Sequence, residues 1–334
     1  MTYTIFKNNR IEGVYERPDK NAEIKNVCDI KWEDNLNNVF NSFTFTTTEK
    51  LECGQIIELV EINNEETVLR GSILTIKKNK NGVYTYIGFD CGDYLVKNNA
   101  IIQYTELDIT NAIIRLCSEF NILVSSDMPN IETKVKKIYK NKALSNIILD
   151  LLKIAKDKNP NYADLYVDCS AGYFNIKKYT ENNNLKACLA NLYRVKSFDL
   201  ITEYEVETSI KNLKNKILIA KNNSGFEKMR KLDFVNDEKS ISNYGLFQTI
   251  IEVDNDTKQD YTKIAYNKLQ ELNKPTQSIK LTFLGDYNAH KGVITTLDDQ
   301  ELGLKGKYLI LDTKHTINGS KEIIESNLKF KQSL

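Results

Sequence analysis

Histidines are scarce in this chain of 334 residues, which contains only His290 and His315. A Ser-His-Asp triad or a histidine-rich metal site depends on this residue type. Neither histidine belongs to an HExxH motif, and the sequence has no GxSxG, P-loop or GxGxxG pattern. His290 lies in a predicted turn and His315 in a predicted strand. We therefore expect both to be structural or surface residues.

Two acidic segments have residue types that could do other chemistry. Residues 254–260 resemble the start of a calcium-binding loop, but the loop's glycine is missing and Ala265 stands where its closing glutamate would be. A polar loop in which Thr257 or Asp260 caps the next helix is the simpler interpretation. The cluster Asp298-Asp299-Gln300-Glu301 could supply the paired carboxylates of a glycosidase, but solvated charges also gather at turn tips. We expect no catalytic, cofactor-binding or metal-binding residues.

A third candidate is basic. Five lysines surround Tyr139, namely Lys134, Lys136, Lys137, Lys140 and Lys142. They could contact phosphate or an acidic neighbouring subunit, although a solvated segment that leads into a helix is the simpler interpretation. The whole chain has 46 Lys and Arg against 45 Asp and Glu, a formal net charge of +1. This balance argues against nucleic-acid binding driven by overall charge.

The cysteines and the N-terminus indicate in which cell compartment the protein is made. The six cysteines are scattered without a CxxC pair, at Cys28, Cys53, Cys91, Cys117, Cys169 and Cys188. We expect buried, reduced thiols rather than a disulfide framework. The N-terminus lacks the basic start and apolar run of a signal peptide, and no apolar stretch is long enough to span a bilayer. We expect a protein that is made in the cytoplasm and leaves it only as part of something larger.

The elements that must position these residues are mainly strands. Residues 42–48 alternate, with Phe43, Phe45 and Thr47 on one face, which is typical of a strand. Asn81-Gly82 separates two further strand candidates, so a hairpin with a type I′ turn is predicted there. Strands that follow at such short intervals through residues 1–105 indicate a small barrel or sandwich.

The middle region changes to a helical period. Apolar residues recur at helical spacing after Asp108, which can serve as N-cap, and again in a second helix that should end near Lys158, before Pro160. Short strands on both sides of Ala171-Gly172 predict a hairpin. Residues 106–184 are therefore expected to form an α+β domain.

Strands are expected again from residue 185. Candidates are residues 203–208, 216–221, 246–253, 278–284, 292–297, 307–317 and 322–330. Residues 222–240 are polar and loop-like, and residues 260–273 form a helix that ends before Pro275. Asn318-Gly319 again predicts a type I′ hairpin. Together, the fold class is mainly β with α+β insertions.

The order of these elements resembles the hub proteins of contractile phage tails and phage-tail-like bacteriocins, including defective-prophage tail hubs and the late-control protein superfamily. The segments that carry the resemblance are 139–151, 166–176, Tyr244–Gln248, Leu281–Asp286, Leu302–Ile310, His315 and Ile323–Phe330. The resemblance is loose but extends along nearly the whole chain. One departure is that many such hubs have a peptidoglycan-binding or lytic extension, for which this sequence has no room after Leu334.

The resemblance implies two tail-tube-like β-barrels per chain, one from residues 1–105 and one from residues 185–221 and 278–334, with an insertion at 222–277. It implies a structural baseplate hub in which a homotrimer forms a pseudo-six-fold ring between the tail tube and the central spike. The implied partners are the tail tube protein, the central spike protein, other baseplate proteins and the tape measure protein. Neither a membrane nor a specific nucleic-acid sequence is an expected partner. The particle is a phage or a DNA-free bacteriocin.

Two alternatives remain open from the sequence. One is an enzyme that hydrolyses cell-wall glycan, with Asp298, Asp299 or Glu301 among its carboxylates. The other is a carbohydrate-binding tail module, which should expose aromatic platforms. The 18 tyrosines are spread evenly along the chain, which favours use in cores and interfaces. We therefore expect no enzymatic activity.

Overall fold

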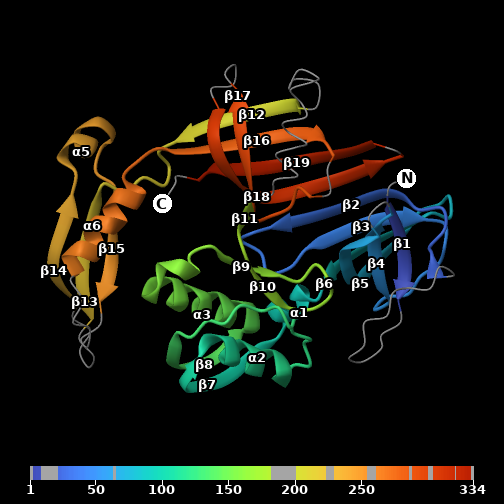
Figure 1. The fold of residues 1–334 in the computed structure, drawn as a ribbon, viewed down its shortest axis with the longest axis horizontal. Coiled ribbons are helices and arrows are strands. Elements are labelled where there is room, and N and C mark those ends of the chain that lie inside the picture. Colours follow the sequence, from blue (N-terminus) through green and yellow to red (C-terminus); the bar gives the residue numbers. More distant parts are fainter. Residues whose placement is uncertain are drawn as a thin grey trace. The chain divides into compact units, whose positions relative to one another are not determined.

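The computed structural model describes most of the chain (Figure 1). The described residues are 3–8, 22–62, 65–181, 201–222, 229–253, 261–285, 288–299, 304–319 and 321–331. They divide into two units, one of residues 1–205 with 280–334 and one of residues 206–279. None of the helices in these described ranges has the length and apolar character that crossing a membrane requires.

A twelve-stranded sheet dominates the larger unit, with the main order β1-β4-β5-β6-β3-β2-β18-β19-β16-β12, while β17 pairs with β18 and β11 with β17. The N-terminal strands are β1 (Tyr3–Asn8), β2 (Cys28–Asn35), β3 (Ser42–Thr47), β4 (Ile56–Glu61), β5 (Glu66–Lys78) and β6 (Tyr84–Asp90). The later strands are β11 (Thr180–Glu181), β12 (Ile201–Ser209), β16 (Thr276–Leu284), β17 (Val293–Asp299), β18 (Leu304–Asn318) and β19 (Lys321–Phe330). The mainly β fold class is confirmed.

Alternation in the sequence explains the N-terminal strands. In β3 the buried residues are Phe43, Phe45 and Thr47, as predicted. Phe45 stacks on Phe43 and on Tyr86 of β6, with ring centroids 6.2 and 5.1 Å apart. These rings belong to an apolar core that β1 to β6 share with Ile317 of β18. Burying the aromatic face of the strand is what fixes its register.

Both Asn-Gly hairpins exist, but their turns differ from the prediction. β5 pairs with β6, where Gly82 takes a left-handed φ of 79° and Asn81 does not. A hydrogen bond from Gly82 N to Asn79 O closes the turn, so a type I turn with a left-handed glycine replaces type I′. Between β18 and β19 the pairing continues to Asn318 and Lys321. The turn therefore begins at Gly319 rather than at Asn318.

The α+β region of the larger unit has its own apolar core, formed by both long helices and their strands. Its elements are α1 (Gly92–Lys97), β7 (Asn99–Asp108), α2 (Ile109–Glu119), β8 (Lys134–Ala143), α3 (Leu144–Lys158), η2 (Pro160–Tyr162), β9 (Leu165–Asp168) and β10 (Asn175–Lys178). Asp108 caps α2 by accepting a hydrogen bond from Asn111 N at 2.9 Å. The predicted end of α3 at Lys158 and the hairpin of β9 with β10 are confirmed.

The smaller unit contains a three-stranded sheet in the order β14-β13-β15. Its elements are β13 (Lys216–Asn222), β14 (Met229–Asn236), α5 (Glu238–Tyr244), β15 (Gln248–Val253) and α6 (Tyr261–Leu272). Ala265 and Leu269 of α6 pack on Ile217 and Ile219 of β13. The polar stretch expected to be a loop contains β14 and α5, so that prediction was wrong. β13 was expected to belong to the second barrel. It pairs with β14 and β15 instead, and α6 covers its apolar residues.

Candidate functional site

The two β regions meet where β2 pairs with β18, and the strands of the two regions become one sheet there (Figure 1). His315 lies opposite Trp32, and Ile317 opposite Ile30. We call this pairing, together with the polar residues around it, the joint. It brings together residues almost 300 positions apart in the sequence. The joint is therefore a tertiary feature that no local pattern predicts.

His315 fills the centre of the joint. Its side chain is fully buried and stacks on Trp32, with ring centroids 4.3 Å apart and an interplanar angle of 12°. Nδ1 is 2.8 Å from Glu322 Oε1, and Nε2 is 2.9 Å from the carbonyl oxygen of Ala289. The Tyr3 hydroxyl donates to the other oxygen of Glu322 at 2.8 Å. Both ring nitrogens therefore have partners within the buried core of the joint.

Asp34 of β2 accepts hydrogen bonds across the joint. Its Oδ1 accepts hydrogen bonds from the backbone N and the hydroxyl of Thr313 on β18, at 2.9 and 2.8 Å. Its Oδ2 accepts from the backbone N of Lys291 at 3.0 Å, in the turn before β17. One carboxylate thus holds three donors from two separate segments. Charge-assisted bonds of this kind are among the stronger hydrogen bonds in proteins.

A buried lysine extends this network. Lys291 Nζ donates to Asn41 Oδ1 at 2.9 Å. Asn41 in turn donates to Asp90 Oδ2, from Nδ2 at 2.7 Å and from its backbone N at 3.0 Å. Gly92 N donates to Asp90 Oδ1 at 2.9 Å. The lysine, the asparagine and the aspartate come from three segments: the turn before β17, the residue before β3 and the end of β6.

The network contains both positive and negative groups, and their surroundings shift the pKa values of its two aspartates in opposite directions. Burial raises the pKa of Asp90 to about 7, although the nearby Lys291 ammonium lowers it in part. Asp168 is buried as well, which alone would raise its pKa, but Lys177 at 2.6 Å and Lys291 hold the pKa below its usual value. Neutralising one carboxyl while keeping another ionised lets a buried cluster of mixed charge persist.

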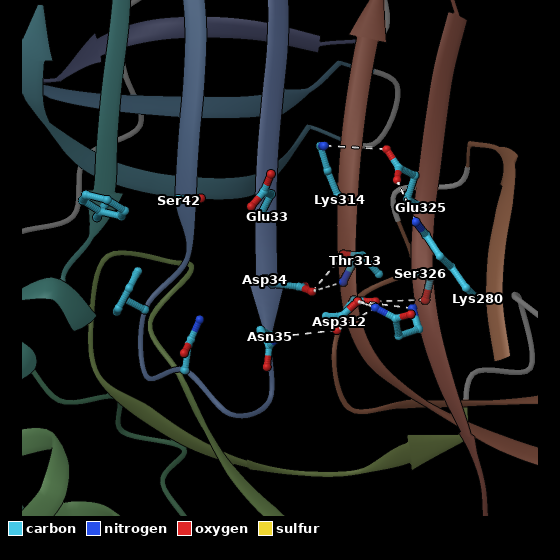
Figure 2. Close-up of a pocket in the computed structure, with 14 residues that line it drawn as sticks. Glu33, Asp34, Asn35, Ser42, Lys280, Asp312, Thr313, Lys314, Glu325 and Ser326 are labelled. Carbon is cyan, nitrogen blue, oxygen red and sulfur yellow. Dashed lines mark hydrogen bonds and ion pairs between the residues drawn. The ribbon is translucent and has the colours of Figure 1, made fainter. Parts of the chain in front are cut away.

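Two hollows border the joint. One has a cavity volume of about 330 Å³ and a polar lining; Figure 2 shows Asp34 turned toward Thr313, and Lys314 beside Glu325. The Glu325 carboxylate lies 3.6 Å from Lys280 Nζ and 3.7 Å from Lys314 Nζ. The other hollow, of about 230 Å³, is lined by the Lys291 network. In the described residues no group of His, Cys, Asp and Glu is placed to hold a metal ion.

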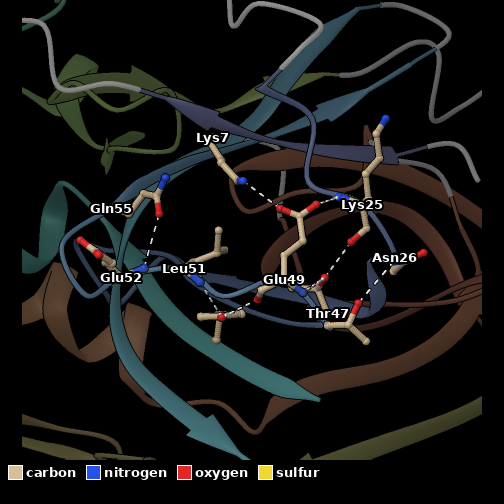
Figure 3. A network of polar contacts seen from close by, with 10 residues as sticks. Lys7, Lys25, Asn26, Thr47, Glu49, Leu51, Glu52 and Gln55 are labelled. Atoms are coloured by element: carbon tan, nitrogen blue, oxygen red, sulfur yellow. Dashed lines mark hydrogen bonds and ion pairs between the residues drawn. The ribbon is translucent and has the colours of Figure 1, made fainter. Parts of the chain in front are cut away.

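A second polar network lies in the N-terminal β region (Figure 3). Glu49 pairs with Lys7 Nζ at 2.8 Å and accepts a hydrogen bond from Lys25 N at 2.6 Å. Burial alone would raise the pKa of Glu49, but these partners bring it below the usual value. The Tyr86 hydroxyl accepts from Leu51 N and donates to Glu49 O. These contacts fix the segment after β3, and they include no nucleophile beside a base.

β12, the last strand of the sheet, is exposed, whereas the joint is largely buried. β12 pairs only with β16 in the described sheet, and every residue from Thr202 to Thr208 is exposed. Glu203, Glu205 and Glu207 alternate along it, and Tyr204 remains 52% exposed between them. An exposed edge strand is a ready template for pairing with another chain.

The lysine run predicted as a solvated segment is a strand, β8, which leads directly into α3. Its apolar side chains Val135 and Tyr139 are buried, while all five lysines are exposed. Exposed isoleucines lie among these charges, Ile138 on β8 and Ile101 on the paired strand β7. The lysines are therefore solvated and lead into a helix, as predicted, and the pairing with β7 adds that the segment is a strand whose Val135 and Tyr139 face inward.

The remaining candidate residues from the sequence are His290, the acidic cluster 298–301 and the acidic segment 254–260. His290 lines the smaller hollow, with Nδ1 3.0 Å from the carbonyl oxygen of Lys291. Asp298 and Asp299 end β17, whereas Glu301 and the acidic segment 254–260 are outside the described residues. The positions of these carboxylates relative to the histidines therefore lie outside what the structure describes. Lys291, Asn41 and Asp90 were missed, because a lysine in a polar turn gives no signal that it is buried.

The cysteines differ in part from the expectation. Cys117 and Cys169 are buried and Cys91 is half-buried, but Cys28 and Cys53 are exposed. All five are free thiols, and Cys188 lies outside the described residues. Burial raises the pKa of Cys117 to about 12. Such a thiol stays protonated and unreactive.

Comparison with known proteins gives consistent results. The family profile described as YQBQ-like matches residues 30–329. The Bacillus subtilis (strain 168) protein "Uncharacterized protein YqbQ" is 23% identical over 257 residues, or 75% of this chain and 74% of that protein. The 43 kDa tail protein of prophage MuSo2 from Shewanella oneidensis has a TM-score of 0.66 at 13% identity and matches over 98% of both chains. The tail protein from Neisseria meningitidis MC58 also has a TM-score of 0.66, at 14% identity over 98% of this chain and 97% of that one. The resemblance to phage tail proteins is thus confirmed at the level of the fold.

Proposed function

This chain belongs to the YQBQ-like family, and from that premise we propose that it is the structural baseplate hub of a contractile tail or tail-like particle. In this proposal three copies form a ring with pseudo-six-fold symmetry, between the tail tube and the central spike. The observation that carries the proposal is the shared fold with two tail proteins, one of them from a prophage, over nearly their whole lengths. The absence of a catalytic grouping in the described residues gives an enzymatic alternative no support.

The joint supports this role physically. A hub that transmits force must not separate between its two β regions. Pairing of β2 with β18 joins them by backbone hydrogen bonds, and Asp34, His315 and Glu322 hold the surrounding segments through buried polar contacts. Fully satisfied buried networks make a structure rigid. The two β regions can then act as one body within a ring.

The exposed strands support contact between copies. A cyclic trimer needs two different surfaces that fit each other, because each subunit meets its neighbours head to tail. The glutamates of β12 and the lysines of β8 offer opposite charges and exposed apolar residues between them. Two β12 strands facing each other would repel. We therefore propose that β12 of one copy faces β8 of the next.

The proposed partners follow from the position of a hub. They are the tail tube protein, the central spike protein, other baseplate proteins and the tape measure protein. The chain would be made in the bacterial cytoplasm, reside in the assembled particle and be released by lysis. No membrane or nucleic-acid sequence is a proposed partner.

Gold-labelled antibody against the chain tests the location. Particles released from lysed cells are imaged by electron microscopy, with antibody against the tube protein as the control. Label at one end of the tube, where the spike attaches, is the expected result. Label along the whole tube would contradict a hub and favour a tube subunit.

A further inference from the structure

Lys291, Asn41 and Asp90 form a buried triad that the proposed assembly does not use. The exposed fractions of the three residues are 2%, 3% and 2%. The lysine amine touches the asparagine carboxamide through Nζ and Oδ1, 2.9 Å apart. The carboxamide nitrogen lies 2.7 Å from Asp90 Oδ2. An amine, a carboxamide and an acid thus follow one another, and each side chain is almost fully buried.

These three groups are the reactants and the proton carrier of an amide exchange. A lysine amine is nucleophilic once it has lost its proton. The carboxamide needs a proton on its nitrogen before that nitrogen can leave, and a buried carboxyl of raised pKa can hold one near neutral pH. Near-complete burial leaves little surface of the same carboxamide open to hydrolysis by water.

We propose that Lys291 and Asn41 condense into an intramolecular isopeptide bond, with Asp90 carrying the proton. The lysine tip first swings from Asn41 Oδ1 to the Asp90 carboxylate, which it does not contact in this structure, and gives it one proton. The Nζ lone pair then attacks Asn41 Cγ, and the carbonyl π electrons move to Oδ1. As the tetrahedral intermediate collapses, the Cγ–Nδ2 bond breaks and Asp90 delivers a proton to the departing nitrogen. Asp90 takes back one proton from Nζ, so the products are an amide and one ammonia, with no oxidant or other reactant.

The surroundings hold the reactants in place. The backbones of Asn41 and Asp90 are hydrogen-bonded, since Asp90 N donates to Asn41 O at 3.1 Å. Lys291 is fixed by its backbone bond to Asp34. Space is tight at Gly92, where an added Cβ would come within 2.1 Å of Val39 O. For attack, the lysine tip must rotate out of the amide plane so that Nζ lies over Cγ.

Other charges face the amine. They are Asp34 on β2, Asp168 on β9 and Lys177 on β10, and Asp168 is already paired with Lys177. The bond would therefore remove one positive charge from a cluster that contains two lysines and three aspartates. It would also tie the turn before β17 covalently to the start of β3. That link lies beside the joint, so it would resist separation of the two β regions under force, whatever assembly the chain enters.

Intact mass spectrometry of the denatured full-length protein tests the proposal. The wild-type chain is expected to be lighter than its sequence by one ammonia, about 17 Da. A tryptic digest should contain one branched peptide that joins the segment of Asn41 to the segment of Lys291. A folded wild-type chain with its full sequence mass would overturn the proposal.

Substitutions test whether the loss of ammonia comes from Lys291, Asn41 and Asp90. K291R keeps the positive charge but cannot form the bond, and N41A removes the carboxamide, so both should have full mass. D90N should also have full mass, since it keeps both reactants and lacks the proton carrier. K177R, a lysine of the same cluster, should keep the loss of about 17 Da. Circular dichroism checks that each variant is folded.

One other reaction releases ammonia, the closure of a succinimide at Asn81-Gly82 or Asn318-Gly319. That ring opens in mild base and regains the mass of water, whereas an isopeptide bond does not. A loss that survives K291R, or that mild base reverses, would therefore contradict the proposed bond. A loss that survives D90N alone would contradict the role of Asp90.

Discussion

The joint and the β12 edge are parts of the same sheet, and they treat charge in opposite ways. At the joint, Asp34 is half-buried and accepts hydrogen bonds from Thr313 and Lys291, and the fully buried His315 contacts Glu322 and Ala289. On β12, Glu203, Glu205 and Glu207 point into solvent from an edge strand. Buried charges demand fixed partners, whereas exposed charges steer association and choose partners. The chain thus satisfies its inner edge with its own residues, while in the proposed assembly a neighbouring copy would satisfy the outer edge.

Asp90 gives the largest expected effect, through pH. The raised folded pKa of about 7, against 3.8 for the ordinary carboxyl, means that the folded state keeps a proton that the unfolded chain has lost. The stability from this group is therefore present below about pH 4 and falls as pH rises toward 7, by up to about 4 kcal/mol. D90N should lack this slope. Urea unfolding at a series of pH values measures it, and equal slopes in both proteins would contradict the buried, protonated carboxyl.

Asp34→Ala should weaken the joint itself. It leaves the donors of Thr313 and Lys291 without their acceptor, so we expect a loss of about 2–3 kcal/mol in the free energy of unfolding. Trp32 is the only tryptophan in the chain and lies at the joint, so its fluorescence follows this region alone. The exposed Asp127 provides the control, D127A. An unchanged midpoint in D34A would mean that the joint does not depend on its carboxylate.

His315→Ala should have a smaller effect. The change removes the ring stacked on Trp32 and one partner of the Glu322 carboxylate, with an expected cost of about 1–2 kcal/mol. The tryptophan emission should also change, since its stacked neighbour is lost. The other histidine is the matched control, and H290A should stay within about 0.5 kcal/mol of the wild type. Equal effects of the two variants would contradict a special place for His315.

Charge reversal on β12 should affect the folded chain least. E203K/E205K/E207K changes only exposed side chains, so the free energy of unfolding should move by no more than about 0.5 kcal/mol. Self-association should be lost, because lysines would then face the lysines of β8. The control reverses three exposed acids elsewhere, E52K/D127K/E132K, and should associate like the wild type. A reversed β12 that leaves association intact would remove this strand from the interface.

The parts predicted from the sequence are those that depend on local patterns. The apolar faces of α2 and α3, the alternation of β3 and the two Asn-Gly hairpins all arise from residues close in the chain. β14 was missed because it lies in a polar stretch. The joint and the Lys291 triad could not be predicted, since Asn41 and Lys291 are 250 positions apart and their burial depends on how the strands pair. The likeness in fold to tail proteins was predicted from the order of elements.

Light scattering of the purified chain over a dilution series tests the proposed hub most directly. We expect a stable particle of three times the chain mass of 38.4 kDa. The β12 reversal should convert it to a single chain, and the control triple variant should not. A wild-type chain that stays at 38.4 kDa at every concentration, and does not reach the trimer mass when the spike and tube proteins are added, would contradict the trimeric hub.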